Sequence, residues 1–176
     1  MPRLINFADP RGGRFWTPGN SGGGGGAVEY GVTGIESASP QYQDTPGYTY
    51  GWKFQVGASA VDIEGLRIYS AVSGNVNLKL WRVSDQAEIG AVTVAGVTDT
   101  WVEGSITPVT LSASAQYIVS REGASGQYHE DESDAAVSTN SALTLITGCY
   151  LNFAGYPAND FNNLRFYGVA DIIITA

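Results

Sequence analysis

The sequence predicts an all-β fold: an antiparallel β-sandwich behind an extended N-terminal arm. The number of strands favours a sandwich of jelly-roll type. Apolar and polar residues alternate with a period of two over most of the chain, as in half-buried strands. Glycine (23) and tyrosine (10) are abundant in the 176 residues, against a single methionine. Turn signals such as Thr107-Pro108 separate the short runs, and no window shows the apolar spacing of an amphipathic helix. Such a pattern is typical of sandwiches with jelly-roll topology.

The N-terminal segment differs in kind from the rest of the chain. It contains three prolines and ends in five consecutive glycines, so it lacks the apolar surface needed to fold alone. Its three arginines and one aspartate give a net charge of +2, whereas the other 150 residues carry 6 basic and 16 acidic residues. We therefore divide the chain into an anchoring arm (1–26), a first strand and connection (27–47) and a sandwich domain (48–176).

The strands follow from the alternation. Residues 27–35 alternate weakly and predict a first strand, and residues 36–50 form a connection rich in Pro, Ser and Tyr. In Ile63–Ser70, Leu66 and Ile68 point to one face while the residues between them point to the other. Further strands are predicted at Trp52–Val56, Asn75–Val83, Ile89–Ala95, Trp101–Ile106, Gln116–Arg121, Leu143–Ile146, Cys149–Phe153 and Leu164–Thr175.

Composition limits the partners and the compartment. The single cysteine, Cys149, excludes an internal disulfide, and its apolar surroundings predict a small buried residue. A net charge of −8 argues against nucleic acid or an anionic membrane as partner. No apolar run approaches the roughly 20 residues that span a bilayer, and no secretory leader is recognisable. We expect a protein made in a bacterial cytoplasm.

The chain offers little that resembles catalytic chemistry. His129 is the only histidine, so no His-pair metal site is expected, and its polar neighbours favour a surface position. No Gly-x-Ser-x-Gly nucleophile motif occurs. The run Gly22–Gly26 lacks the Lys-Ser/Thr of a phosphate loop and indicates a flexible hinge. We therefore expect neither an enzyme nor a bound cofactor.

Two groups of residues are candidates for ligand binding. Acidic residues are concentrated in the segment after His129, and carboxylate oxygens are typical ligands of Ca²⁺. Their spacing fits no EF-hand, and the alternative is a solvated acidic loop. Tyrosines in or near the loops could stack on the sugar rings of a host glycan. The calcium candidates are Glu130, Asp131, Glu132 and Asp134, and the glycan candidates are Tyr42, Tyr48, Tyr50, Tyr128 and Tyr156.

Several motifs carry a family resemblance. They include GWKF at 51–54, IEGLRIY at 63–69, and a closing segment in which Phe166 or Tyr167 supplies an aromatic residue and Asp171 an acid. Over roughly residues 48–176, the chain resembles an uncharacterised all-β accessory module of secreted bacterial proteins and bacteriophage proteins. The resemblance implies a jelly-roll-like fold. Its motifs are mostly core and turn residues, which specify a fold better than a function.

A basic arm ahead of an acidic body predicts a component of an assembly. The resemblance to a module of bacteriophage proteins further implies a structural virion protein of a tailed bacteriophage. We expect a capsid decoration or cement protein whose arm binds neighbouring coat or tail subunits, in a homo-oligomer or a lattice. The alternative is a carbohydrate-binding adhesion module of a tail fibre or tail tip. Aromatic and arginine side chains dominate interface hot spots, which favours the arm as the binding element. The expected subunit-binding residues are Arg3, Leu4, Ile5, Phe7, Arg11, Arg14, Phe15 and Trp16.

Overall fold

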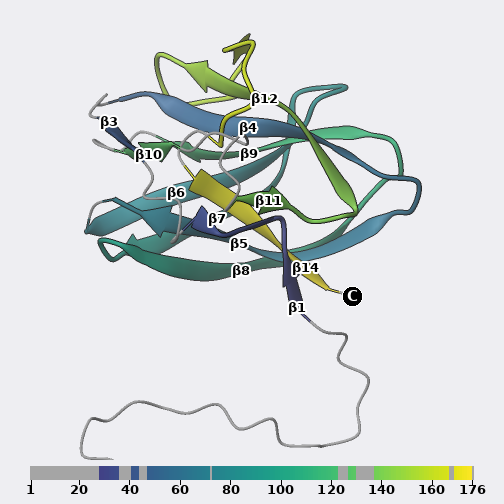
Figure 1. Cartoon of the computed structure of the whole chain (residues 1–176), viewed down its shortest axis with the longest axis horizontal. Coiled ribbons are helices and arrows are strands. Elements are labelled where there is room, and N and C mark those ends of the chain that lie inside the picture. The colour runs from purple at the N-terminus through teal and green to yellow at the C-terminus, as the bar shows by residue number, and fades with distance from the viewer. Residues whose placement is uncertain are drawn as a thin grey trace, which may run out of the picture.

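The computed structural model is an antiparallel β-sandwich, which confirms the predicted all-β class (Figure 1). The structure describes residues 28–35, 41–43, 47–71, 73–122, 127–129, 137–166 and 169–175. The jelly-roll type stays a prediction. The strands are β1 (Val28–Tyr30), β2 (Val32–Thr33), β3 (Gln41–Gln43), β4 (Thr49–Val56), β5 (Val61–Ser70), β6 (Gly74–Arg82), β7 (Ala87–Gly96), β8 (Thr100–Leu111), β9 (Gln116–Glu122), β10 (Gln127–His129), β11 (Ser138–Thr139), β12 (Leu143–Leu151), β13 (Asn159–Asp160) and β14 (Ala170–Thr175).

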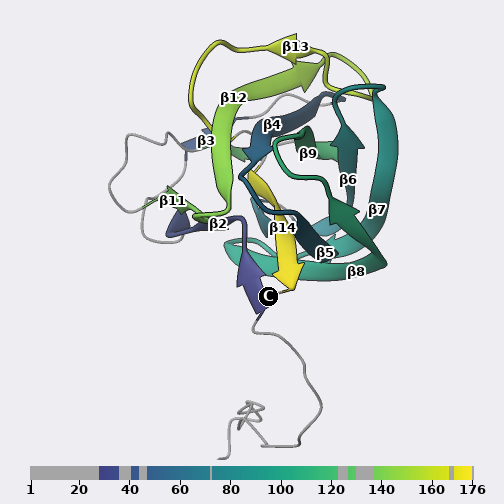
Figure 2. The ribbon, with the colours of Figure 1, turned by 90° about the vertical axis from the view of Figure 1, so that its right-hand side faces the viewer.

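Two main sheets form the layers of the sandwich, and Figure 2 shows them facing each other. The first has four strands in the order β1-β14-β5-β8. The second has six strands in the order β13-β12-β4-β9-β6-β7. Every neighbouring pair in both sheets is antiparallel. Strand β14 therefore lies between the first strand of the body and a central strand of the same sheet.

Short strands connect the layers at one side of the sandwich. The backbone N–H of Gly31, which follows β1, donates to the carbonyl of Ile172 on β14 at 3.1 Å. The next residues form β2, which leaves that sheet and pairs with β11, just ahead of β12 in the six-stranded sheet. A second short pair joins β3 and β10. The first strand of the body is thus tied to both layers.

Large apolar side chains fill the space between the sheets. Trp52 and Phe54 of β4 are fully buried, with ring centroids 5.0 Å apart, and the Phe166 ring meets Trp52 edge-on at 5.2 Å. From the four-stranded sheet, Leu66 and Ile68 of β5 are also completely buried, as the alternation predicted. Burying side chains of this size is worth roughly 1.5–3 kcal/mol each. The core is therefore the main source of stability.

Some predicted boundaries were wrong. The turn expected at Thr107-Pro108 does not end a strand, because β8 continues to Leu111. Proline is tolerated there since β8 is the last strand of its sheet and the pairing is irregular at this point. Two predicted strands, Leu143–Ile146 and Cys149–Phe153, form one strand, β12, with a bulge between Leu145 and Thr147. The last strand begins at Ala170 instead of Leu164.

Gly51 of β4 pairs with Ser120 of β9 at a position that leaves no room for a side chain. A Cβ atom at this position would lie 2.3 Å from the carbonyl oxygen of Val119 and 3.0 Å from Cα of Ser120. Both obstacles belong to backbone held in the sheet, so neither can move aside cheaply. We expect Gly51→Ala to lower the free energy of unfolding by about 2–3 kcal/mol, measured by urea denaturation.

Gly57→Ala is the matched control. Its Cβ would approach only the Ala142 carbonyl oxygen, at 3.2 Å, and its backbone angle is accessible to alanine. The change should cost less than about 1 kcal/mol. Equal losses in the two variants would contradict the close approach at Gly51.

Candidate functional site

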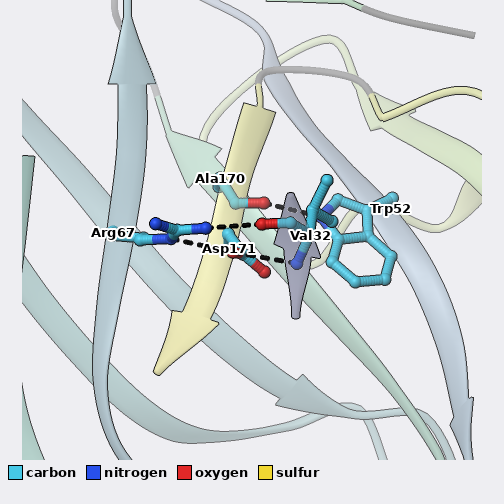
Figure 3. Close-up of polar contacts among 5 residues, drawn as sticks. All are labelled: Val32, Trp52, Arg67, Ala170 and Asp171. Carbon is cyan, nitrogen blue, oxygen red and sulfur yellow. Dashed lines mark hydrogen bonds and ion pairs between the residues drawn. The ribbon is translucent and has the colours of Figure 1, made fainter. Parts of the chain in front are cut away.

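A buried ion pair joins β5 to β14, the last strand, and is hydrogen-bonded to Val32 at the start of β2 (Figure 3). Arg67 of β5 donates from Nε to Oδ2 of Asp171 of β14 at 2.9 Å, and both side chains are almost completely buried. The backbone N–H of Val32 donates to the same carboxylate oxygen at 3.1 Å. Nη2 of Arg67 donates in turn to the carbonyl of Val32. These three residues, which we call the clamp, fix the start of β2 to two strands of the four-stranded sheet.

Two aromatic rings cover the clamp. The guanidinium carbon of Arg67 lies 3.5 Å from the ring centroid of Tyr30 and 3.8 Å from that of Trp101. A cation stacked on ring faces is attracted by their quadrupoles, and most strongly where water is excluded. The rings therefore contribute to the stability of the buried Arg67 charge.

Burial has a measurable effect on the acid of the clamp. Complete desolvation raises the pKa of the Asp171 carboxyl to about 6, although Arg67 and the Val32 N–H both act to lower it. The second oxygen, Oδ1, has no hydrogen-bond partner among the described residues. A pKa of about 6 still lies below neutral pH, so the carboxyl is mainly ionised there and is the negative partner of Arg67.

Glycine is required beside the clamp. A Cβ atom on Gly31 would lie 2.3 Å from Oδ1 of Asp171 and 2.8 Å from the side chain of Ile172. The absence of a side chain allows the backbone between β1 and β2 to pass directly over the carboxylate. The clamp is also linked to the other layer, because Nε1 of Trp52 donates to the carbonyl of Ala170 at 2.6 Å (Figure 3).

A groove opens on the outer face of the four-stranded sheet, where two strands are irregular. Glu64 of β5 is a bulged residue, since its neighbours Ile63 and Gly65 pair in register with both adjacent strands and Glu64 does not. On β8, residues 106–108 are likewise left out of the register. Bulges bend strands and occur often beside functional sites. The groove has a volume of about 820 Å³ and is lined by Val28, Tyr30, Glu64, Gly65, Glu103, Gly104, Ser105, Ile106, Pro108 and Ile173.

The groove is acidic on an apolar floor. Glu64 and Glu103 supply two carboxylates, and none of the described residues that line it is basic. A second hollow of about 390 Å³ shares Glu64 and Pro108 with the groove and adds the acid Asp62. Ile173 and Pro108 supply apolar surface. A ligand for this region must therefore be neutral or cationic, with an apolar part.

Tyr30 connects the clamp to the groove. One face of its ring packs on the Arg67 guanidinium, and its hydroxyl is hydrogen-bonded to Glu103. Partial burial and the hydrogen bond with Glu103 both raise the pKa of the phenol, so it remains a neutral donor. The clamp thus holds one wall of the groove in position.

The structure separates the tyrosines that the sequence offered as glycan candidates. Tyr48 and Tyr50 stack with ring centroids 5.5 Å apart, and Tyr50 stacks in turn on Phe161 at 6.1 Å. Tyr156 instead meets Trp81 edge-on at 5.8 Å. Tyr42 and Tyr128 are register partners in β3 and β10. Stacking within the protein occupies ring faces, and a role of these residues in glycan binding stays a prediction.

Other sequence candidates fall at different places. The subunit-binding residues of the arm and the calcium candidates Glu130, Asp131, Glu132 and Asp134 lie outside the described residues. Within the described part of the chain, no group of three or more His, Cys, Asp or Glu side chains could hold a metal ion. Cys149 is buried as predicted, in a cluster with Trp81 and Ile118, and burial raises the pKa of its thiol. No helix among the described residues is long and apolar enough to cross a membrane.

One family model matches most of the chain. A family model described as Domain of unknown function (DUF4082) matches residues 35–168. The chain belongs to this family. No curated protein matches it. The DUF4082 match includes Arg67, Glu64 and Glu103, whereas β1 and β14, which carry Tyr30 and Asp171, lie outside the matched span.

The groove residues were missed because no local signal marks them. Glu64 and Glu103 are 39 positions apart, and each is an ordinary acid in a strand of alternating pattern. The sequence offers one hint, Pro108, at which it predicts a turn. A proline inside a run of β residues also signals a bulge, and a bulge at Pro108 points to the groove.

Removing one partner of the clamp leaves a buried charge without compensation. We expect Asp171→Asn to lower the free energy of unfolding by about 3–5 kcal/mol in urea denaturation at pH 7. The control is Asp160→Asn, which removes the partner of Lys53 in a more exposed ion pair of 2.8 Å. That variant should lose less than about 1 kcal/mol. A similar loss in both variants would refute the central role of the clamp.

Proposed function

We propose that this member of the DUF4082 family is a non-catalytic structural protein of a bacteriophage particle, specifically a capsid decoration protein. Its sandwich would lie on the particle surface, and its arm would bind neighbouring coat or tail subunits. Support comes first from charge, because a +2 arm precedes a body with 6 basic and 16 acidic residues. Opposite charges favour contacts between the basic arm of one copy and the acidic surfaces of its neighbours.

The observation that carries the proposal is the clamp. Strand β1 has only three residues and lies at the edge of its sheet, so β1 alone would hold an anchored arm weakly. Immediately after it, Val32 is bonded through both its N–H and its carbonyl to the buried Arg67–Asp171 pair. A force on the arm would therefore be transmitted to β5 and β14, the central strands of the four-stranded sheet, within a few residues.

Deleting residues 1–26 tests the proposal. The shortened protein should retain the far-ultraviolet circular dichroism of a β protein but should no longer bind particles that lack the native protein. Binding is measured by co-sedimentation with purified particles. The matched control deletes only Gly22–Gly26, which removes the hinge and keeps every arginine and aromatic residue of the arm.

The two deletions separate anchoring from simple shortening. The control should still bind, since the residues expected to make the contacts remain. If the protein without residues 1–26 binds particles as well as the full chain does, the arm is not the anchor and the proposed function is wrong.

A further inference from the structure

The acidic groove calls for a partner with positive charge. Glu64 and Glu103 line it, Asp62 lines the adjoining hollow, and no described lining residue of either is basic. Ile173 and Pro108 add apolar surface to the lining of the groove. Interfaces are built from complementary potentials, so the fitting partner combines cationic groups with apolar or aromatic ones.

Most of the basic residues of the body are already engaged. The side chains of Lys53, Lys79, Arg67 and Arg82 each lie within 3.1 Å of a carboxylate oxygen of the same chain. Arg121 is buried, and Arg165 makes contacts of its own. The remaining basic residues of the protein are Arg3, Arg11 and Arg14, all in the arm.

The arm contains a segment with the required chemistry. Residues 11–16 read Arg-Gly-Gly-Arg-Phe-Trp, two arginines followed by two aromatic residues. An extended segment of six residues is roughly 20 Å long at about 3.3 Å per residue. Its guanidinium groups can form paired hydrogen bonds with carboxylates, and its rings suit an apolar wall.

The arm of another copy suits assembly better than the arm of the same copy. The arm joins the body at Val28, which itself lines the groove and pairs with Thr175 at the end of β14. An arm folded back into the groove of its own body would leave two acidic bodies with no segment of opposite charge to join them. An arm exchanged between copies supplies that contact.

We propose that the groove receives the 11–16 segment of the arm of a second copy of this chain. Glu64 and Glu103 pair with Arg11 and Arg14, while Phe15 and Trp16 cover the apolar floor. The inference rests on the proposed function and identifies the surface that the arm binds when copies assemble. Donor and acceptor surfaces differ, so the contact can propagate from copy to copy in a ring or a lattice.

Charge exchange between two full-length variants tests the inference. The groove variant carries Glu64→Lys and Glu103→Lys, and the arm variant carries Arg11→Glu and Arg14→Glu. Self-association of each is followed by sedimentation velocity over a range of concentrations. Each variant alone should associate at least tenfold more weakly than the unmodified chain, because its arm and groove carry like charges. An equal mixture should recover association, since each arm then meets a groove of opposite charge.

The control changes charge equally outside the groove. Asp85→Lys with Glu88→Lys alters two acids at the β6–β7 hairpin, and this variant should associate like the unmodified chain. If the groove variant does not fold, Glu64→Lys alone replaces it in the mixture. Circular dichroism identifies that case.

The outcomes separate this inference from the function it rests on. Arm exchange at the groove is overturned if the unmodified chain stays monomeric or if the mixture does not recover association. A chain that stays monomeric because each arm binds its own body overturns it as well. If residues 1–26 are still needed for particle binding in that case, the arm binds a different protein and the proposed function stands.

Discussion

The buried pair of Arg67 and Asp171 is the constraint on which the body depends. Two charges are removed from water between β5 and β14, and their mutual attraction offsets that cost only with good geometry and further hydrogen bonds. The structure supplies these from the N–H and carbonyl of Val32 and from the faces of Tyr30 and Trp101. The pair therefore adds a buried anchor to the short pairings that hold the first strands against β14 and β11.

The same constraint extends to the groove. Tyr30 is held between the Arg67 guanidinium and Glu103, so a residue of the clamp region forms one wall of the acidic groove. On β5, the bulge at Glu64 leaves this acid outside the regular pairing with both neighbouring strands. A rigid wall and a bulged strand together give a preformed surface, and a preformed surface loses less entropy on binding than a flexible one.

The sequence predicted three long strands well, but it ended β8 too early, divided β12 in two and predicted the connections poorly. Alternation located β5, β6 and β9 to within two residues, because each keeps one face toward the core. Strands of two or three residues, such as β2 and β11, are too short to show a period. Their existence depends on tertiary pairing between residues far apart in the chain.

The clamp shows why the site was harder to predict than the fold. Alternation placed Arg67 correctly on the face opposite Leu66 and Ile68, which for a sandwich normally means exposure to water. Its partner lies 104 positions away, and nothing local indicates that Tyr30 and Trp101 would cover it. The resemblance had included both charged residues among its motifs, and their pairing explains why such motifs specify the fold.

Internal pairing of charge also shapes the outer surface. Because the lysines and arginines of the body are largely used within the chain, the excess acids determine the field that a neighbour meets. Two such bodies repel each other where their faces meet directly. In the proposed assembly, contact between copies is made by the one segment of opposite sign, so the charge that keeps the bodies apart would also select the arm as the connecting element.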